Sequence, residues 1–137
     1  MSHSTYLKKI FDPTLFKRTV RKVVKKVREI QKTTPFNAIA FTGQSGAAMA
    51  YPVACKTELF LICVRKVGEK CHGQQIESAN NRDIKNYIII DDLMGTGATV
   101  MRIREQLKEV DIGDCVGIVL YDGTSIRSFS PPVYHIN

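Results

Sequence analysis

The sequence lacks long apolar runs and a leader-like start. No stretch approaches the roughly 18 consecutive apolar residues of a spanning helix, and the chain begins with the polar segment MSHSTYLKK. Neither a membrane helix nor a secretory signal is therefore expected. The chain also lacks a Cys-x-x-Cys pair, and only His72 stands beside one of its cysteines, which are Cys55, Cys63, Cys71 and Cys115. This pattern favours reduced thiols in a cytoplasmic protein over a metal site.

Acidic residues are scarce in the first quarter of the chain. Residues 1–32 hold ten Lys or Arg and two acids, a net charge of +8, whereas residues 33–137 hold ten basic and eleven acidic residues, a net charge of −1. Apolar residues between 16 and 30 recur at helical intervals; Asp12 can cap this helix, Pro13 suits its first turn, and the helix ends before Pro35. Basic residues fill its other face, namely Lys17, Arg18, Arg21, Lys22, Lys25 and Lys26. A solvated face that attracts anions is expected, and a nucleic-acid surface is the alternative.

The remaining chain alternates short apolar runs with helical patterns. Strands are predicted at 37–42, 58–64, 86–91 and 115–121, and helices at 45–55, where Pro52 counts against continuity, and at 98–109. The apolar runs are continuous, which is typical of parallel strands covered on both faces. With 137 residues, the chain is predicted to be one α/β domain with a mostly parallel sheet flanked by helices. Residues 1–35 would form a basic arm and helix, residues 36–121 the core, and residues 122–137 a tail. Within the core, residues 67–85 are expected to form a loop or loose hairpin.

One segment carries the pattern of a phosphate site. Tyr87–Val100, YIIIDDLMGTGATV, reads as a buried strand, two carboxylates, a glycine-bearing loop and a helix. Ligands of parallel sheets bind beyond the carboxyl ends of the strands, and a helix start offers free N–H groups and a positive dipole end. We expect an anion at Gly95–Thr99, with the carboxylates of Asp91 and Asp92 accessible beside it. Ala98 stands where a Walker loop needs lysine, and a third glycine is missing for a dinucleotide fingerprint.

IIIDDLMGTGAT resembles the ribose 5-phosphate motif of the type I phosphoribosyltransferases, which bind 5-phosphoribosyl 1-pyrophosphate (PRPP). AFTGQSGAAMA resembles their pyrophosphate loop, and VRK at 64–66 resembles the basic end of their next strand, so the likeness extends over about residues 36–121. It implies that Asp91 and Asp92 hold the ribose hydroxyls and take part in binding Mg²⁺, partly through the ligand. The 5-phosphate would lie against Met94, Gly95, Thr96, Gly97, Ala98 and Thr99. The pyrophosphate would lie against Gly43, Gln44, Ser45, Gly46 and Arg65 or Lys66.

Three departures from that family's pattern limit the inference. The pyrophosphate segment at 43–46 has no Lys or Arg, Gly95 stands where 6-oxopurine enzymes carry an acid, and residues 67–85 are short for a closing lid. The resemblance also implies a non-proline cis peptide within Gly43–Ser45, a homodimer, and a hood over the acceptor made from residues 1–16 and 122–137.

The function expected from the resemblance is transfer of ribose 5-phosphate from PRPP to a nucleobase or related acceptor, with release of pyrophosphate. The alternative is a noncatalytic regulator of the same fold that senses PRPP or a nucleotide and binds nucleic acid through the basic helix.

Overall fold

The computed structural model describes residues 7–66, 75–79, 81–123 and 130–136. They form one six-stranded sheet in the order β3-β2-β1-β4-β5-β6. The strands are β1 (Ala38–Phe41), β2 (Phe60–Val64), β3 (Ile76–Ser78), β4 (Tyr87–Asp91), β5 (Cys115–Leu120) and β6 (Val133–His135). Only the pairing of β2 with β3 is antiparallel. The α/β class and the mostly parallel sheet are therefore confirmed.

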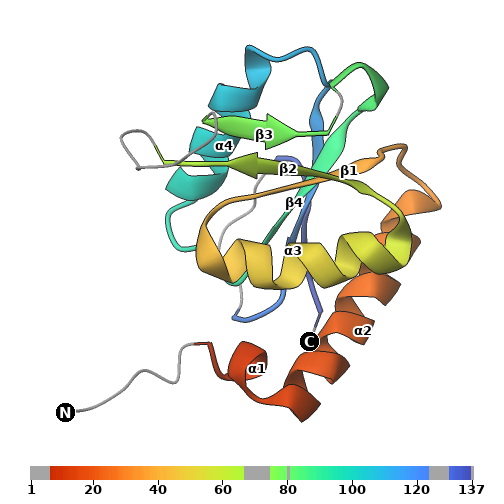
Figure 1. Cartoon of the computed structure of the whole chain (residues 1–137), viewed down its shortest axis with the longest axis vertical. Helices are drawn as coiled ribbons and strands as arrows, with labels where there is room; N and C mark the ends of the chain where they lie inside the picture. Colours follow the sequence, from red (N-terminus) through yellow and green to blue (C-terminus); the bar gives the residue numbers. More distant parts are fainter. Residues whose placement is uncertain (1–6, 67–74, 80, 124–129, 137) are drawn as a thin grey trace.

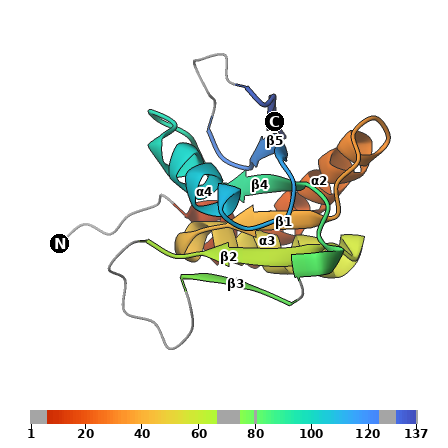
Figure 2. The same cartoon turned by 90° about the horizontal axis from the view of Figure 1, so that it is seen from above.

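Helices cover both faces of this sheet (Figures 1 and 2). One face packs against α2 (Pro13–Gln31) and α3 (Gly43–Thr57), and the other against α4 (Ala98–Lys108). In β4 the apolar run is continuous because both faces of the strand are covered: Ile88 and Ile90 pack toward α2 and α3, whereas Ile89 packs toward α4. All three isoleucines are fully buried, which stabilises the centre of the sheet.

The N-terminal region forms a short helix, α1 (Lys8–Phe11), followed by the predicted basic helix α2. The Asp12 carboxylate accepts hydrogen bonds from the N–H groups of Thr14 and Leu15 at 2.9 and 3.0 Å. This is the predicted helix cap, and Pro13 occupies the first helical position as expected. The apolar face of α2 is buried against the sheet and α3, which leaves the cations on its outer side.

The other predicted elements lie within about two residues of the observed ones. The helix α3 continues through Pro52 and ends at Thr57, and the next residue, Glu58, adopts a left-handed conformation with φ 57°. Within 67–85, residues 76–78 pair with β2 as a hairpin and residues 81–83 form a 3₁₀ turn, η1 (Asn81–Asp83), while 67–74 and 80 lie outside the described residues. In the part of the chain that the structure describes, no helix has the length and apolarity needed to cross a membrane.

Candidate functional site

The topology brings the two predicted binding segments to one edge of the sheet. β1 and β4 are parallel neighbours, so their carboxyl ends lie side by side. The helix α3 begins at Gly43, directly after β1, and α4 begins at Ala98, six residues after Asp92. Both helix starts therefore border the carboxyl ends of adjacent strands. We call this region, Thr42–Gly46 with Asp91–Thr99, the carboxyl-edge site.

The two acids of this site are buried, contrary to the accessibility expected of them. Asp91 is 9% exposed and Asp92 is 4% exposed. Sheet-like backbone pairing continues past β4 at these residues: the N–H groups of Tyr121 and Asp122 donate to the carbonyl oxygens of Asp91 and Asp92 at 3.1 and 2.8 Å. Both acids are thus held inside the edge of the sheet. Asp91 nevertheless borders the small hollow formed by the following loop.

Contacts fix the Asp91 carboxylate but leave part of Asp92 unsatisfied. Asp91 Oδ1 accepts hydrogen bonds from the Asp92 N–H at 2.9 Å and from Ser45 Oγ at 3.3 Å. Asp92 Oδ2 is buried and has no hydrogen-bond partner among the described residues. Buried polar atoms normally have a partner, so this oxygen is a candidate contact for a bound ligand.

The electrostatic environment favours a proton on Asp91. Burial raises the pKa of its carboxyl group to about 7, assisted by the adjacent Asp92 carboxyl, while the Asp92 N–H lowers it in part. Burial penalises the charged form, and a second acid beside it adds to this penalty. A cation or a hydrogen-bond donor on a ligand would favour the ionised form instead.

The loop after Asp92 surrounds a hollow of about 60 Å³, lined by Asp91 and residues 93–100. A single water needs about 10–15 Å³, so the hollow has room for a group of a few atoms. Gly97 precedes α4 with φ 86°, a left-handed conformation that favours glycine. Thr96 and Thr99 are exposed beside the free N–H groups of the helix start, and Thr96 Oγ1 accepts from the Ala98 N–H at 3.3 Å. Met94 also borders the hollow, and its side chain is buried in the core cluster under α4.

The segment Gly43–Gly46 differs from the turn expected from the sequence. It forms the first turn of α3, and the expected cis peptide is wrong, because Ser130-Pro131 is the only cis bond among the described residues. Gly46 lets this turn approach β1 closely: a Cβ atom there would lie 3.2 Å from Phe41 Cβ. The first-turn N–H groups of α3 still point toward the carboxyl edge, as a helix start requires.

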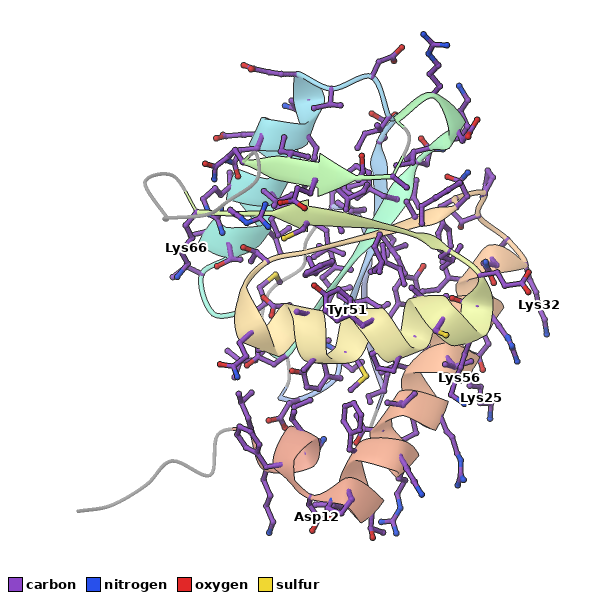
Figure 3. All side chains as sticks on the ribbon, in the orientation of Figure 1. Asp12, Lys25, Lys32, Tyr51, Lys56 and Lys66 are labelled. Carbon is purple, nitrogen blue, oxygen red and sulfur yellow. The ribbon has the colours of Figure 1, made fainter. Side chains whose placement is uncertain are left out.

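The two predicted cations after β2 differ in their surroundings. Arg65 Nη1 lies 2.6 Å from Glu77 Oε1, so its guanidinium forms an ion pair across the β2–β3 hairpin. Lys66 is exposed at the end of β2, and Figure 3 shows it on the side of the molecule where α3 begins. Of the two, Lys66 is the better placed to reach a ligand.

A third cation, Arg102 of α4, was missed by the sequence analysis. Its Nη2 donates to Thr42 Oγ1 at 3.2 Å and its Nη1 donates to the Arg65 carbonyl at 3.1 Å. This guanidinium links α4 to the carboxyl ends of β1 and β2. Its position four residues after Ala98, on the same helix face, is the signal that could have identified it.

Three further contacts involve the start of α3 and the residues that follow β5. The Tyr121 hydroxyl donates to the Ser45 carbonyl at 2.7 Å, and Tyr121 is only 1% exposed. Lys9 Nζ lies 3.5 Å from Asp122 Oδ1 and donates to the Tyr121 carbonyl at 3.2 Å. The N-terminal region therefore meets residue 122, so parts of both expected hood segments are neighbours.

Solved phosphoribosyltransferases share this architecture. Adenine phosphoribosyltransferase from Saccharomyces cerevisiae, solved with adenine and an imino-altritol bisphosphate, matches with a TM-score of 0.73 and 19% identity, over 92% of this chain and 80% of that one. Orotate phosphoribosyltransferase from Francisella tularensis matches with a TM-score of 0.68 and 16% identity, over 93% of this chain and 68% of that one. The UMP synthase of Leishmania donovani matches with a TM-score of 0.64 and 23% identity, over 84% of this chain and 24% of that one.

No protein-family model matches the sequence, and no curated protein matches it significantly. The chain therefore has the fold of the phosphoribosyltransferases, established by structural likeness at low sequence identity.

Proposed function

We propose that the chain is a phosphoribosyltransferase that transfers ribose 5-phosphate from PRPP to a nucleobase or related acceptor and releases pyrophosphate. The observation that carries this proposal is the meeting of two helix starts with the Asp91–Asp92 pair at the carboxyl ends of β1 and β4. PRPP carries a phosphate and a pyrophosphate on either side of a ribose with two hydroxyl groups. Two anion-binding helix starts flanking two acids match that order of groups.

Each part of the carboxyl-edge site takes one part of this ligand. The 5-phosphate accepts hydrogen bonds from the N–H groups of Gly95–Thr99 and from the hydroxyls of Thr96 and Thr99. Asp91 and Asp92 accept from the ribose 2- and 3-hydroxyls, which requires Asp91 to lose its proton. The pyrophosphate lies against the first turn of α3 at Gly43–Gly46, with Lys66 and Arg102 as nearby cations.

The acids also fit a Mg²⁺ ion. Mg²⁺ prefers oxygen ligands and is commonly held by one or two carboxylates together with substrate phosphates. The unsatisfied Asp92 Oδ2 is such an oxygen, and the described residues contain no cluster of three or more potential metal ligands that would bind the ion alone. When bound, the ion would neutralise charge on the leaving pyrophosphate.

The site offers no group for covalent catalysis of this reaction. An acceptor nitrogen attacks the anomeric carbon as the bond to pyrophosphate breaks, through a transition state of oxocarbenium character. The chain's residues therefore act by alignment and by stabilising negative charge on the leaving group. Contacts from Tyr121 to Ser45 and from Ser45 to Asp91 hold the two halves of the site in register for this purpose.

Calorimetry with PRPP and Mg²⁺, followed by assay of pyrophosphate release with a panel of nucleobases, tests the proposal. Binding together with release in the presence of one base is the expected result, and 6-oxopurines should be poor acceptors because Gly95 replaces the acid that serves them. Binding without release under any base would favour the noncatalytic regulator. Failure to bind PRPP would exclude both functions.

We further propose a homodimer, supported by apolar surface beside β2 and β3. Tyr51 of α3 is 55% exposed, stacks edge-on against Phe41 with ring centroids 5.3 Å apart, and borders a hollow of about 930 Å³ with Leu61 and Cys63. Neither Asp91 nor Asp92 lines this hollow. Light scattering at tens of micromolar should give twice the 15.4 kDa chain mass; a single species of 15.4 kDa would exclude the dimer.

A further inference from the structure

A basic groove runs between α2 and α3, away from the carboxyl-edge site. Its volume is about 620 Å³ and its floor includes the buried Val24. We call it the α2–α3 groove. Five exposed cations line it: Arg21, Lys25 and Arg28 of α2, Lys32 directly after α2, and Lys56 of α3. Figure 3 shows Lys25, Lys32 and Lys56 grouped where the two helices lie side by side.

The positive charge of this groove is not neutralised within the described residues. Glu29 is the only acid that lines it, and its Oε2 lies 3.2 Å from Lys26 Nζ. None of the five groove cations takes part in the ion pairs of the described chain. Arg28 Nη2 donates to the Lys56 carbonyl at 3.1 Å, which joins the two walls. The groove therefore carries an excess of positive charge.

Further cations extend this charge along α2. Lys25 also borders a hollow of about 320 Å³ with Lys22 and Lys26, and Lys22 borders another of about 350 Å³ with Lys8 and Lys9. Neighbours three or four positions apart on a helix lie about 5–6 Å from each other. The result is a row of cations that suits a chain of regularly spaced anions better than a single small anion.

The surroundings of the groove identify its partner. The large apolar side chains that are exposed in the described residues are Phe11, Tyr51, Leu93 and Met101, and none of them lies on α2. A protein partner normally needs an apolar core at the contact, and an interfacial membrane helix needs a free apolar face, whereas that of α2 is buried. The cations line a groove rather than a flat face, so we expect it to accept a flexible single strand more readily than a rigid duplex.

We propose that the α2–α3 groove binds the phosphodiester backbone of a single-stranded nucleic acid. The groove holds no aromatic side chain for base stacking, so recognition depends on phosphates and is largely independent of sequence. It lies at the C-terminal end of α3, whereas the carboxyl-edge site lies at its N-terminal end, about 22 Å away for a 15-residue helix. Binding at the groove therefore leaves the carboxyl-edge site open.

The test uses fluorescence anisotropy with a labelled oligouridylate, an oligothymidylate of equal length and the matching duplex. The double variant Lys25→Gln/Lys32→Gln removes two exposed charges from the groove, and Lys85→Gln/Lys108→Gln removes two exposed charges elsewhere, so both have the same net charge. The groove variant should bind both single strands on the order of tenfold more weakly, with a salt slope lower by about 1.4. The control should bind as the wild type does, and the two oligonucleotides distinguish RNA from DNA as the preferred strand.

Several outcomes would overturn the proposal. Equal weakening in both double variants would mean that net charge alone drives binding. Tighter binding of the duplex than of either single strand would exclude a single-strand groove. Equal binding of polyglutamate, or binding of anionic vesicles in place of oligonucleotides, would assign the surface to an acidic protein or a membrane.

Discussion

The carboxyl-edge site and the α2–α3 groove are both proposed to meet phosphate, but they do so with different groups. At the carboxyl edge the donors are backbone N–H groups of two helix starts, and the acids between them are nearly inaccessible. In the groove the donors are exposed Lys and Arg side chains, which lie on the outside of two helices. The first set is held by the fold, whereas the second keeps the rotamer freedom of long side chains.

This difference separates recognition by shape from attraction by charge. A fixed arrangement of N–H groups and carboxylates discriminates between ligands by geometry, so a change that conserves size but alters hydrogen bonding has a large effect. Exposed lysines are screened by salt and tolerate exchange for arginine, since each contributes mainly its charge. Salt, substitution and pH should therefore affect the two surfaces differently.

Salt should produce the largest contrast. If all five groove cations contact phosphates of a single strand, the salt slope is about −3.5, so affinity should fall roughly a hundredfold between about 50 and 200 mM salt. Binding of PRPP at the carboxyl edge should fall much less, because fewer side-chain cations take part. Anisotropy and calorimetry over the same salt series measure both. An equal salt dependence of oligonucleotide binding and PRPP binding would contradict this difference between the groove and the carboxyl-edge site.

Loss of either buried acid should weaken PRPP binding by roughly ten- to a hundredfold. Asp91→Asn and Asp92→Asn conserve size but remove a charged acceptor, and a hydrogen bond to a charged group contributes about 1.5–3 kcal/mol. Calorimetry with PRPP and Mg²⁺ measures the change, and turnover should fall at least as far. Asp111→Asn, at an exposed acid beyond α4, is the matched control and should bind normally. Unaltered binding in both variants would exclude the proposed ribose contact.

Removal of Arg102 should have a smaller effect, of about three- to tenfold on PRPP affinity. Arg102→Gln keeps a polar side chain near Thr42 but removes a charge from the pyrophosphate region, where Gly43–Gly46 supply none. Arg104→Gln on the same helix is the control, since its guanidinium bonds to the Ser130 carbonyl instead. Inhibition by added pyrophosphate should weaken in the first variant alone. If both variants weaken equally, Arg102 has no specific role.

Much of the fold could be predicted because its strands are covered on both sides. The run Tyr87–Asp91 is buried at every position, which is why continuous apolarity located β4 to within a residue. The order of strand, loop and helix likewise located the start of α4 at Ala98, as the glycines Gly95 and Gly97 and the later apolar face indicated. These signals are local, and they depend on neighbours within one element.

The remaining features depend on contacts between distant parts of the chain. The backbone of Asp91 and Asp92 pairs with Tyr121 and Asp122, about 30 residues later, and Arg102 contacts Thr42, 60 residues earlier. Gly43–Gly46 was expected to be a turn because of the resemblance to a pyrophosphate loop, yet it forms the first turn of α3, where Gly46 lies close to Phe41. Apart from the spacing of Arg102 from Ala98 on one helix face, these interactions have no signature in local spacing.

The last expected effect is on folding rather than on binding: a dependence of stability on pH that originates at Asp91. Its pKa is raised by burial from 3.8 to about 7 in the folded protein, so between about pH 4 and pH 7 the folded state holds a proton that the unfolded chain has lost. Protonation thus favours folding, and the contribution is complete below pH 4 and lost as the pH rises through 7. In metal-free buffer, the free energy of unfolding of the wild type should fall over this interval relative to that of Asp91→Asn, as measured by urea denaturation at matched pH values. Lys25→Gln/Lys32→Gln changes only exposed groove residues, so its profile should run parallel to that of the wild type. Parallel profiles for wild type and Asp91→Asn would instead show that Asp91 is ionised throughout this interval. The carboxyl-edge site would then lack the raised pKa that distinguishes its buried acid from the exposed charges of the groove.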